Sequence, residues 1–245
     1  MRNICLTLEY DGTAYHGWQR QREQITVQQV LEDALSDLFA APITVNGCGR
    51  TDAGVHALNY CCNFFADTSI ECRKIVPAVN VRLPDDIRIK LARDADDNFH
   101  ARFSVKQKQY MYKITNTPVQ NVFMRNYAWH YKYPLNIELM QQASLHMLGE
   151  HDFTAFASSD MNVSSTVRTI YSIDISKNQD NIISIHVCGN GFLYNMVRII
   201  TGTLVYCGCG KIPPESVADI IASADRTKAG ITAPPQGLYM EKVIY

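Results

Sequence analysis

The sequence predicts an α+β protein built from two ferredoxin-like subdomains, each with the element order β-α-β-β-α-β and with antiparallel or mixed sheets. Three observations support this fold class. Apolar residues alternate along several short segments, which is the period of a half-buried strand. Other segments carry apolar residues three and four positions apart, as amphipathic helices do. The two kinds of segment follow one another in a similar order in both halves of the chain.

The first half opens with a strand, because Ile4, Leu6 and Leu8 alternate along it. Thr26 is a candidate helix cap, and apolar residues follow it at helical spacing. The remaining elements are expected as strands at 43–48 and 56–65, a short helix at 70–79 and a strand at 87–92. Together they make an N-terminal ferredoxin-like subdomain, expected at residues 1–104.

The second half has a similar order with one further helix. The polar sequence KNQD at 177–180 lies between two alternating segments and predicts a hairpin turn. The segment 192–207 is apolar nearly all round, which predicts a buried helix. The expected elements are a strand at 104–115, a helix at 136–148, strands at 166–176 and 181–188, helices at 192–207 and 214–224, and a strand at 237–245. They form a C-terminal subdomain, expected at residues 105–245.

The composition limits the class of protein. Hydrophobic residues make up 47% of the 245 residues, which is enough for a substantial core and argues against disorder. The eight cysteines include no C-x-x-C pair, so we expect no zinc finger or ribbon and interpret them as reduced thiols of a cytoplasmic protein. The N-terminal MRNICLTLEY is too short and too polar for a signal peptide, and no apolar run reaches membrane-spanning length.

The charge distribution is uneven although the formal net charge is only −1. A nearly neutral chain argues mildly against nucleic acid as a partner. However, residues 98–137 contain no Asp or Glu, and a basic segment of this kind suits a phosphate-binding surface. The alternative is chance clustering on a solvated face. The basic residues of this segment are Arg102, Lys106, Lys108, Lys113, Arg125 and Lys132.

The sequence GCGRTDAGVHAL at 47–58 places Arg50 and Asp52 two residues apart, in a loop between two apolar stretches. One interpretation is a salt-bridged loop with no chemical role. The other is a catalytic carboxylate held beside a guanidinium. This segment alone does not distinguish the two interpretations, so other segments of the chain are needed.

Two further segments mix aromatic and basic residues, as RNA-binding surfaces do. The sequence YDGTAYHGWQRQ at 10–21 precedes Arg22 and includes Arg20; its alternative is a surface loop with one buried tryptophan. In KQKQYMY at 106–112, strand alternation puts two lysines and two tyrosines on one face, which could hold a flipped base and its backbone. The alternative is an ordinary amphipathic strand. The four residues on that face are Lys106, Lys108, Tyr110 and Tyr112.

The apolar helix predicted near the C-terminus carries Arg198 as the one charge within 190–204. A buried arginine needs a partner, because an unpaired buried charge is very costly. We expect that partner to be the Asp52 carboxylate. The alternative is that the helix face that carries Arg198 is exposed to water.

These segments together resemble the bacterial TruA-type tRNA pseudouridine synthases. The resemblance covers nearly the whole chain; residues 49–57 are its most specific part and residues 157–166 its least similar part. The matching motifs are DGTAYHGWQ (11–19), GRTDAGVHA (49–57), FHARF (99–103), KQYMY (108–112) and FLYNMVR (192–198), supported by GEHDFTAF (149–156), RTI (168–170) and GLYM (237–240).

The resemblance implies that the chain isomerises uridine in RNA to its C-glycoside, without a cofactor or a metal, and that the two subdomains form one catalytic unit. Asp52 would be the carboxylate at the glycosidic carbon. Arg50 would enter the space that the flipped base leaves, and Arg198 would keep Asp52 ionised. Tyr110 would stack on the flipped uracil. Whether Asp52 attacks C1′, adds to C6 or removes a ribose proton stays open.

The resemblance also implies action in the tRNA anticodon stem-loop, at positions 38, 39 and 40, by a homodimer that places one tRNA across both subunits. The residues expected to contact RNA are Arg20, Arg22, His56, Lys106 and Lys108. The alternatives are a non-catalytic RNA-binding protein of the same fold and a pseudouridine synthase acting at other RNA positions. A small-molecule enzyme of ferredoxin-like fold would leave the basic and aromatic strand unexplained.

Overall fold

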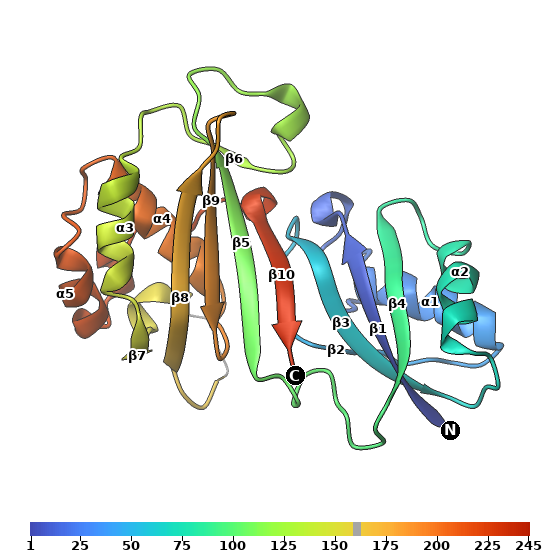
Figure 1. The fold of residues 1–245 in the computed structure, drawn as a ribbon. Helices are drawn as coiled ribbons and strands as arrows, with labels where there is room; N and C mark the ends of the chain where they lie inside the picture. Colours follow the sequence, from blue (N-terminus) through green and yellow to red (C-terminus); the bar gives the residue numbers. More distant parts are fainter. Residues whose placement is uncertain (159–162) are drawn as a thin grey trace. The chain divides into compact units, whose positions relative to one another are not determined.

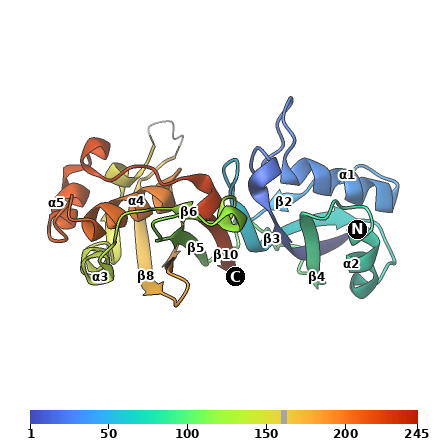
Figure 2. The same cartoon turned by 90° about the horizontal axis from the view of Figure 1, so that it is seen from above.

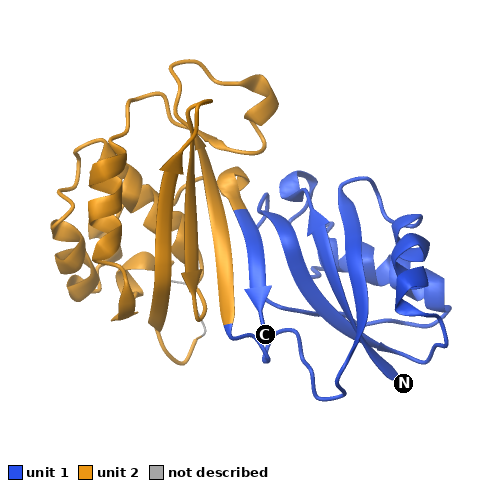
Figure 3. Cartoon of the chain, in the orientation of Figure 1, with its two compact units in different colours: residues 1–106, 239–245 blue, residues 107–238 orange. Residues whose placement is uncertain are grey.

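A computed structural model describes residues 1–158 and 163–245 and confirms the predicted α+β class (Figure 1). The segment 157–166, least similar to the family pattern, therefore lies partly outside the described residues. Contacts divide the chain into a first unit of residues 1–106 and 239–245 and a second unit of residues 107–238 (Figure 3). The subdomain boundary expected between residues 104 and 105 stays a prediction.

The first unit has the β-α-β-β-α-β order that the sequence predicts. Its elements are β1 (Arg2–Tyr10), α1 (Val27–Phe39), β2 (Asn46–Gly47), β3 (His56–Ala66), α2 (Cys72–Asn80) and β4 (Ile87–Ala95). β1 lies between β4 and β3 and is antiparallel to both, and the short β2 is antiparallel to β3. Helices α1 and α2 contact each other, and Figure 2 shows α1 running alongside the strands of this unit.

Local chemistry explains where α1 begins and ends. The Thr26 hydroxyl accepts a hydrogen bond from the backbone N–H of Gln29, which satisfies one of the first amides of the helix. Ala40 adopts the left-handed conformation, with φ of 51°, and stops the helix. Between these ends, Leu31 and Leu35 are fully buried, as the apolar face of an amphipathic helix requires.

The second unit contains an antiparallel sheet in the order β5-β9-β8-β7, and β6 runs parallel to β5. Helix α4 contacts both β5 and α3, and α5 lies on its outer side (Figure 2). The elements are β5 (Gln107–Thr115), β6 (Trp129–His130), α3 (Ile137–Leu145), β7 (Gly149–Asp152), β8 (Val167–Lys177), β9 (Ile182–Gly189), α4 (Met196–Gly208) and α5 (Ser216–Ser223).

The last strand, β10 (Leu238–Ile244), pairs in parallel with the start of β3, where Tyr239 lies opposite His56. Contacts therefore group most of β10 with the first unit, although it follows the second unit in sequence. Five single turns of 3-10 helix complete the described elements, at Gly12–Ala14, Val122–Met124, Thr154–Phe156, Arg226–Lys228 and Pro235–Gly237.

Two predicted elements differ from the structure by more residues than the others, for reasons that lie in the backbone. The helix expected at 192–207 begins only at Met196, because Asn195 is left-handed, with φ of 61°. The strand expected at 43–48 shrinks to two residues, because only Asn46 and Gly47 pair with β3. The hairpin turn expected at 177–180 is present between β8 and β9, where the Asn178 amide donates to the Ile182 carbonyl oxygen.

Among the described residues, no helix combines the length and the apolar character needed to cross a membrane.

Candidate active site

The loop between β2 and β3 exposes Arg50, half-buries Asp52 and buries the residue between them, Thr51. The Thr51 hydroxyl lies 2.9 Å from the Tyr10 hydroxyl, and its carbonyl oxygen accepts a hydrogen bond of 3.1 Å from the Trp18 amide. Thr51 therefore anchors the loop to β1 and to the residues after it. This anchor fixes the backbone on both sides, where the two charged side chains arise.

Residues 11–18 pack directly on the same loop. The Gly54 amide donates to the Tyr15 carbonyl oxygen at 3.3 Å, and the Val55 amide donates to the Asp52 carbonyl oxygen at 3.2 Å. Gly17 has a φ of +82°, and a Cβ there would lie 2.3 Å from the Thr51 carbonyl oxygen. Only glycine allows this close approach, so the DGT and GRTD motifs form one structural unit.

Replacement of Gly17 by alanine tests this close packing. The left-handed backbone alone costs an alanine about 1–2 kcal/mol. The clash with the Thr51 carbonyl adds to that cost, so we expect urea unfolding to show a larger loss of stability than strain alone gives. Gly210→Ala is the matched control, because Gly210 has a φ of +75° and no atom within 4 Å of the added Cβ. Equal losses in the two variants would show that residues 51–53 move aside freely.

An aromatic cluster lies beneath the loop. The rings of Trp18 and Tyr60 stack with centroids 3.9 Å apart, and Tyr10 packs against both. The Tyr60 hydroxyl donates to the Gly49 carbonyl oxygen, and burial raises its pKa well above the ordinary value, so it stays protonated. Trp18 is 3% exposed. Trp18 therefore supports the loop and offers no ring face to RNA. For this residue, the alternative interpretation of residues 10–21, a surface loop with one buried tryptophan, is correct.

The predicted RNA contacts of the first unit have different surroundings. His56 is 2% exposed: its Nδ1 lies 3.0 Å from the Gly12 amide nitrogen and 3.1 Å from Asp11 Oδ1. One ring nitrogen cannot both accept from the amide and donate to the carboxylate, and we favour acceptance, because the amide always carries its proton. A direct RNA contact by His56 would require exposure of this ring, and it stays a prediction.

Arg20 is exposed but engaged in ion pairs. Its Nε lies 2.7 Å from Glu32 Oε2, and its Nη2 lies 3.0 Å from Asp33 Oδ1. Glu32 is buried and also accepts hydrogen bonds from the Gln28 side chain and the Val45 amide. A phosphate would have to compete with these carboxylates for Arg20. Arg22 and Lys106 are exposed, and their RNA contacts stay predictions together with that of Lys108.

In the second unit, the tyrosines predicted to share one face of β5 have different roles. Tyr112 is fully buried, and its hydroxyl donates to the Pro234 carbonyl oxygen at 2.6 Å. Its predicted part in an RNA platform is wrong, because the ring belongs to the core. Tyr110 is 8% exposed and packs against the Phe192 ring in a T-shaped arrangement, with a centroid distance of 5.3 Å. Its stacking on uracil stays a prediction.

Arg198 lies in the first turn of α4 and is half-buried. Its Nε donates to the Ala233 carbonyl oxygen and its Nη1 to Asn195 Oδ1, both at 2.7 Å. The guanidinium is thus held at the N-terminal end of the helix. Asp52 belongs to the first unit and Arg198 to the second, so their ion pair stays a prediction.

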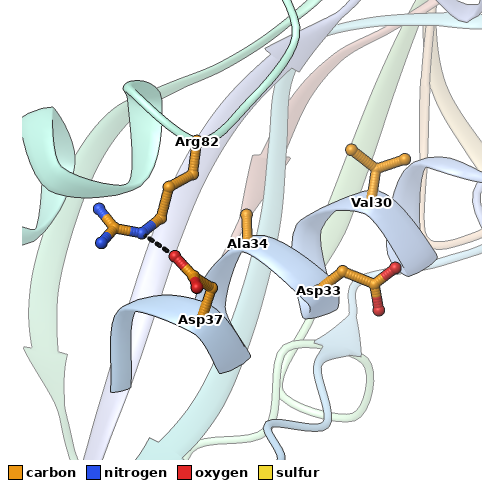
Figure 4. Close-up of a pocket in the computed structure, with 5 residues that line it drawn as sticks. All are labelled: Val30, Asp33, Ala34, Asp37 and Arg82. Carbon is orange, nitrogen blue, oxygen red and sulfur yellow. Dashed lines mark hydrogen bonds and ion pairs between the residues drawn. The ribbon is translucent and has the colours of Figure 1, made fainter. Parts of the chain in front are cut away.

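Other candidate sites are few. Across residues 1–158 and 163–245, no three His, Cys, Asp or Glu side chains gather as metal ligands, and none of the eight cysteines forms a disulfide. A shallow pocket on α1 contains the ion pair between Arg82 and Asp37 (Figure 4). None of the predicted site residues lines it, and its carboxylates would repel a polyanion. Its lining residues are Val30, Asp33, Ala34, Asp37 and Arg82.

Comparisons with known proteins agree with the motifs. The family model described as tRNA pseudouridine synthase matches residues 7–104 and 143–245. The protein named tRNA pseudouridine synthase A of Thermoanaerobacter sp. (strain X514) is 53% identical over 245 residues, and the alignment covers 100% of both chains. Proteins of the same name from Ruminiclostridium cellulolyticum and Clostridium acetobutylicum are 51% and 46% identical, again over 100% of both chains. Because the family model matches most of the chain and these relatives align along all of it, the chain belongs to the tRNA pseudouridine synthase family.

Proposed function

We propose that the protein converts uridines at positions 38, 39 and 40 of the tRNA anticodon stem-loop into pseudouridine, in the cytoplasm, as a homodimer and without a cofactor. The coarser part of this statement rests on family membership: the chain is an isomerase that forms pseudouridine in tRNA. The positions, the cytoplasmic location, the homodimer and the individual roles of the residues are our proposal.

The single observation that carries the catalytic assignment is the anchoring of the loop at Thr51. Reaction at a glycosidic bond needs a carboxylate whose position is fixed before the substrate arrives. The two hydrogen bonds to Thr51 hold the backbone next to Asp52, and Asp52 itself is half-buried. This arrangement favours a catalytic carboxylate over the alternative of a simple salt-bridged loop.

The reaction breaks the N1–C1′ bond of uridine, turns the uracil and joins C5 to C1′. The C5 proton leaves and N1 gains a proton, so no redox partner or co-substrate is needed. The target nucleotide must first leave the helical stack. In this proposal exposed Arg50 fills the vacated space, Tyr110 stacks on the uracil, and Arg198 keeps Asp52 ionised.

The direct test is pseudouridine mapping on bulk tRNA after incubation with the purified protein. We expect new pseudouridine at positions 38, 39 and 40. New pseudouridine at other positions would reject the proposed specificity but keep the chemistry. Binding of tRNA without any product would support the alternative of a non-catalytic RNA-binding protein of the same fold.

Replacement of both Lys106 and Lys108 by alanine should weaken binding to all tRNAs alike. Each lost phosphate contact should reduce the steepness of the salt dependence by about one unit, because fewer counterions are released on binding. The measurement is tRNA affinity across a salt series. The control removes two positive charges from α2, Arg73→Ala with Lys74→Ala, both of which lie near Glu71. If the lysine variant keeps the wild-type salt slope, this segment faces away from RNA.

A further inference from the structure

Arg168, the second residue of β8, is a half-buried arginine without a carboxylate partner among the described residues. Its Nη1 donates to the carbonyl oxygens of Ser165, at 3.0 Å, and Val167, at 2.6 Å. Burial lowers the pKa of its guanidinium, which reflects the cost of removing the charge from water. An arginine that is partly desolvated and, as far as the described residues show, bound only to neutral groups is suited to an anionic ligand.

The strand register places Arg168 on the same sheet face as Tyr110. Lys108 pairs with Gly189, which in turn pairs with Ile170, and Tyr110 pairs with Val187. Paired residues share a face, and residues two apart along a strand share it as well. Arg168 is two residues before Ile170, and the irregularity in β8 comes only after Ile170.

These residues also lie at one end of the sheet. The start of β5, the end of β9 and the start of β8 come together there (Figure 1). The Phe192 ring lies close to Gly189, where an added Cβ would be 3.3 Å from it, and it packs against the Tyr110 ring in a T-shaped arrangement. Arg168 Nε lies 3.8 Å from the corresponding Cβ position at Gly191. Tyr110 therefore contacts Phe192, and Arg168 lies near Gly191, within the same short segment 189–192.

Arg226 resembles Arg168 in its burial but differs from it in its position in the fold. Arg226 is also half-buried, and burial also lowers the pKa of its guanidinium. It donates to the Gly230 carbonyl oxygen at 2.8 Å and to the Thr232 hydroxyl at 3.0 Å, so it closes its own loop. It lies in the segment after α5 and not at the end of the sheet that carries Tyr110. Arg226 is therefore the matched control for Arg168.

We propose that Arg168 binds the phosphate next to the flipped uridine and thereby holds that nucleotide over the Tyr110 ring. The ligand class is a single phosphodiester, and the inference rests on the proposed function. Stacking on Tyr110 would fix the plane of the base but not the backbone on either side of it. The Arg168 guanidinium, which among the described residues is bound only to neutral groups, supplies that second point of attachment at the same end of the sheet. Arg168 thus acts as a substrate-positioning residue.

The test is a chemical double-mutant cycle on an anticodon stem-loop RNA with one target uridine at position 39. The RNA carries either ordinary phosphates or one uncharged methylphosphonate, placed 5′ or 3′ of that uridine. Single-turnover rates at subsaturating enzyme are measured for the wild type and Arg168→Gln. We expect each single change to lower the rate about tenfold or more, because each removes a charge-assisted hydrogen bond. For one of the two methylphosphonates, Arg168→Gln and the modified RNA together should lower the rate no further than either change does alone.

Several outcomes would overturn the inference. Effects that multiply for both methylphosphonates, or an Arg168→Gln variant as fast as wild type, would show that Arg168 does not bind these phosphates. A comparable rate loss in Arg226→Gln would show that the loss is structural. If Arg168→Gln fails to fold, Arg168→Lys takes its place: retention of the charge should preserve discrimination against the same methylphosphonate. Failure of the proposed function is distinct, because the wild type would then form no pseudouridine in the unmodified stem-loop.

Discussion

Asp52→Asn is expected to abolish pseudouridine formation while largely preserving tRNA affinity. The change is nearly isosteric but removes the negative charge, and an amide is a poor nucleophile and a poor base. The anchors of the loop belong to Thr51 and should persist, so the backbone at residue 52 should stay in place. Affinity for tRNA comes mainly from phosphate contacts. The variant should therefore bind tRNA as tightly as the wild type or slightly more tightly, because one negative charge has left the site.

The measurement pairs tRNA affinity with product formed after long incubation, on one purified variant. Asp67→Asn is the control, because Asp67 is an exposed carboxylate outside the loop and should leave activity unchanged. If Arg198 pairs with Asp52 as predicted, Asp52→Asn should also melt at a lower temperature, since a half-buried guanidinium loses its anion. Conversion of uridine at near the wild-type rate would show that the carboxylate is not the catalyst and that residues 47–58 are only a salt-bridged loop.

Tyr110→Ala is expected to cause the second largest loss of activity. Removal of the ring should raise the free energy of the flipped state by roughly 1–3 kcal/mol, which is the range for stacking of one base on an aromatic side chain. Because Tyr110 is largely buried against Phe192, the alanine variant also leaves a cavity and should lose stability. Single-turnover rates are measured well below the melting temperatures of the wild type and the variant. Under these conditions a loss of rate reports the loss of stacking and not the loss of stability.

Tyr110→Phe is the decisive companion variant. It keeps the ring and its contact with Phe192, so it should lose less activity than the alanine variant if stacking dominates. If the phenylalanine variant is as inactive as the alanine variant, the hydroxyl group takes part in the chemistry and the role proposed for Tyr110 is incomplete.

Features that depend on neighbouring residues could be predicted from the amino-acid sequence alone. The alternation around Leu6, the cap at Thr26 and the polar turn after Lys177 each predict an element that the structure contains. These signals are reliable because strand period, helix capping and hairpin turns depend on contacts within a few residues. The motif around Asp52 likewise identifies the family, because its residues are contiguous in the chain.

Packing between distant segments determines which aromatic and charged side chains reach the surface. Trp18 and Tyr112 each lie in a segment that the sequence associates with RNA, yet both are buried. The sequence predicts an RNA contact for Arg20, but in the structure its guanidinium pairs with the buried Glu32 on α1. In each case the deciding neighbour comes from another segment of the chain.

The roles of Thr51 and Arg168 also required the structure. Both residues stand in motifs that the sequence made conspicuous, but no local pattern shows that Thr51 anchors the loop or that Arg168 shares a sheet face with Tyr110. The end of the sequence is a similar case, because β10 pairs with β3 across most of the chain length. Strand pairing and burial depend on contacts between residues far apart in sequence, and a local period carries no information about which distant segment will supply them.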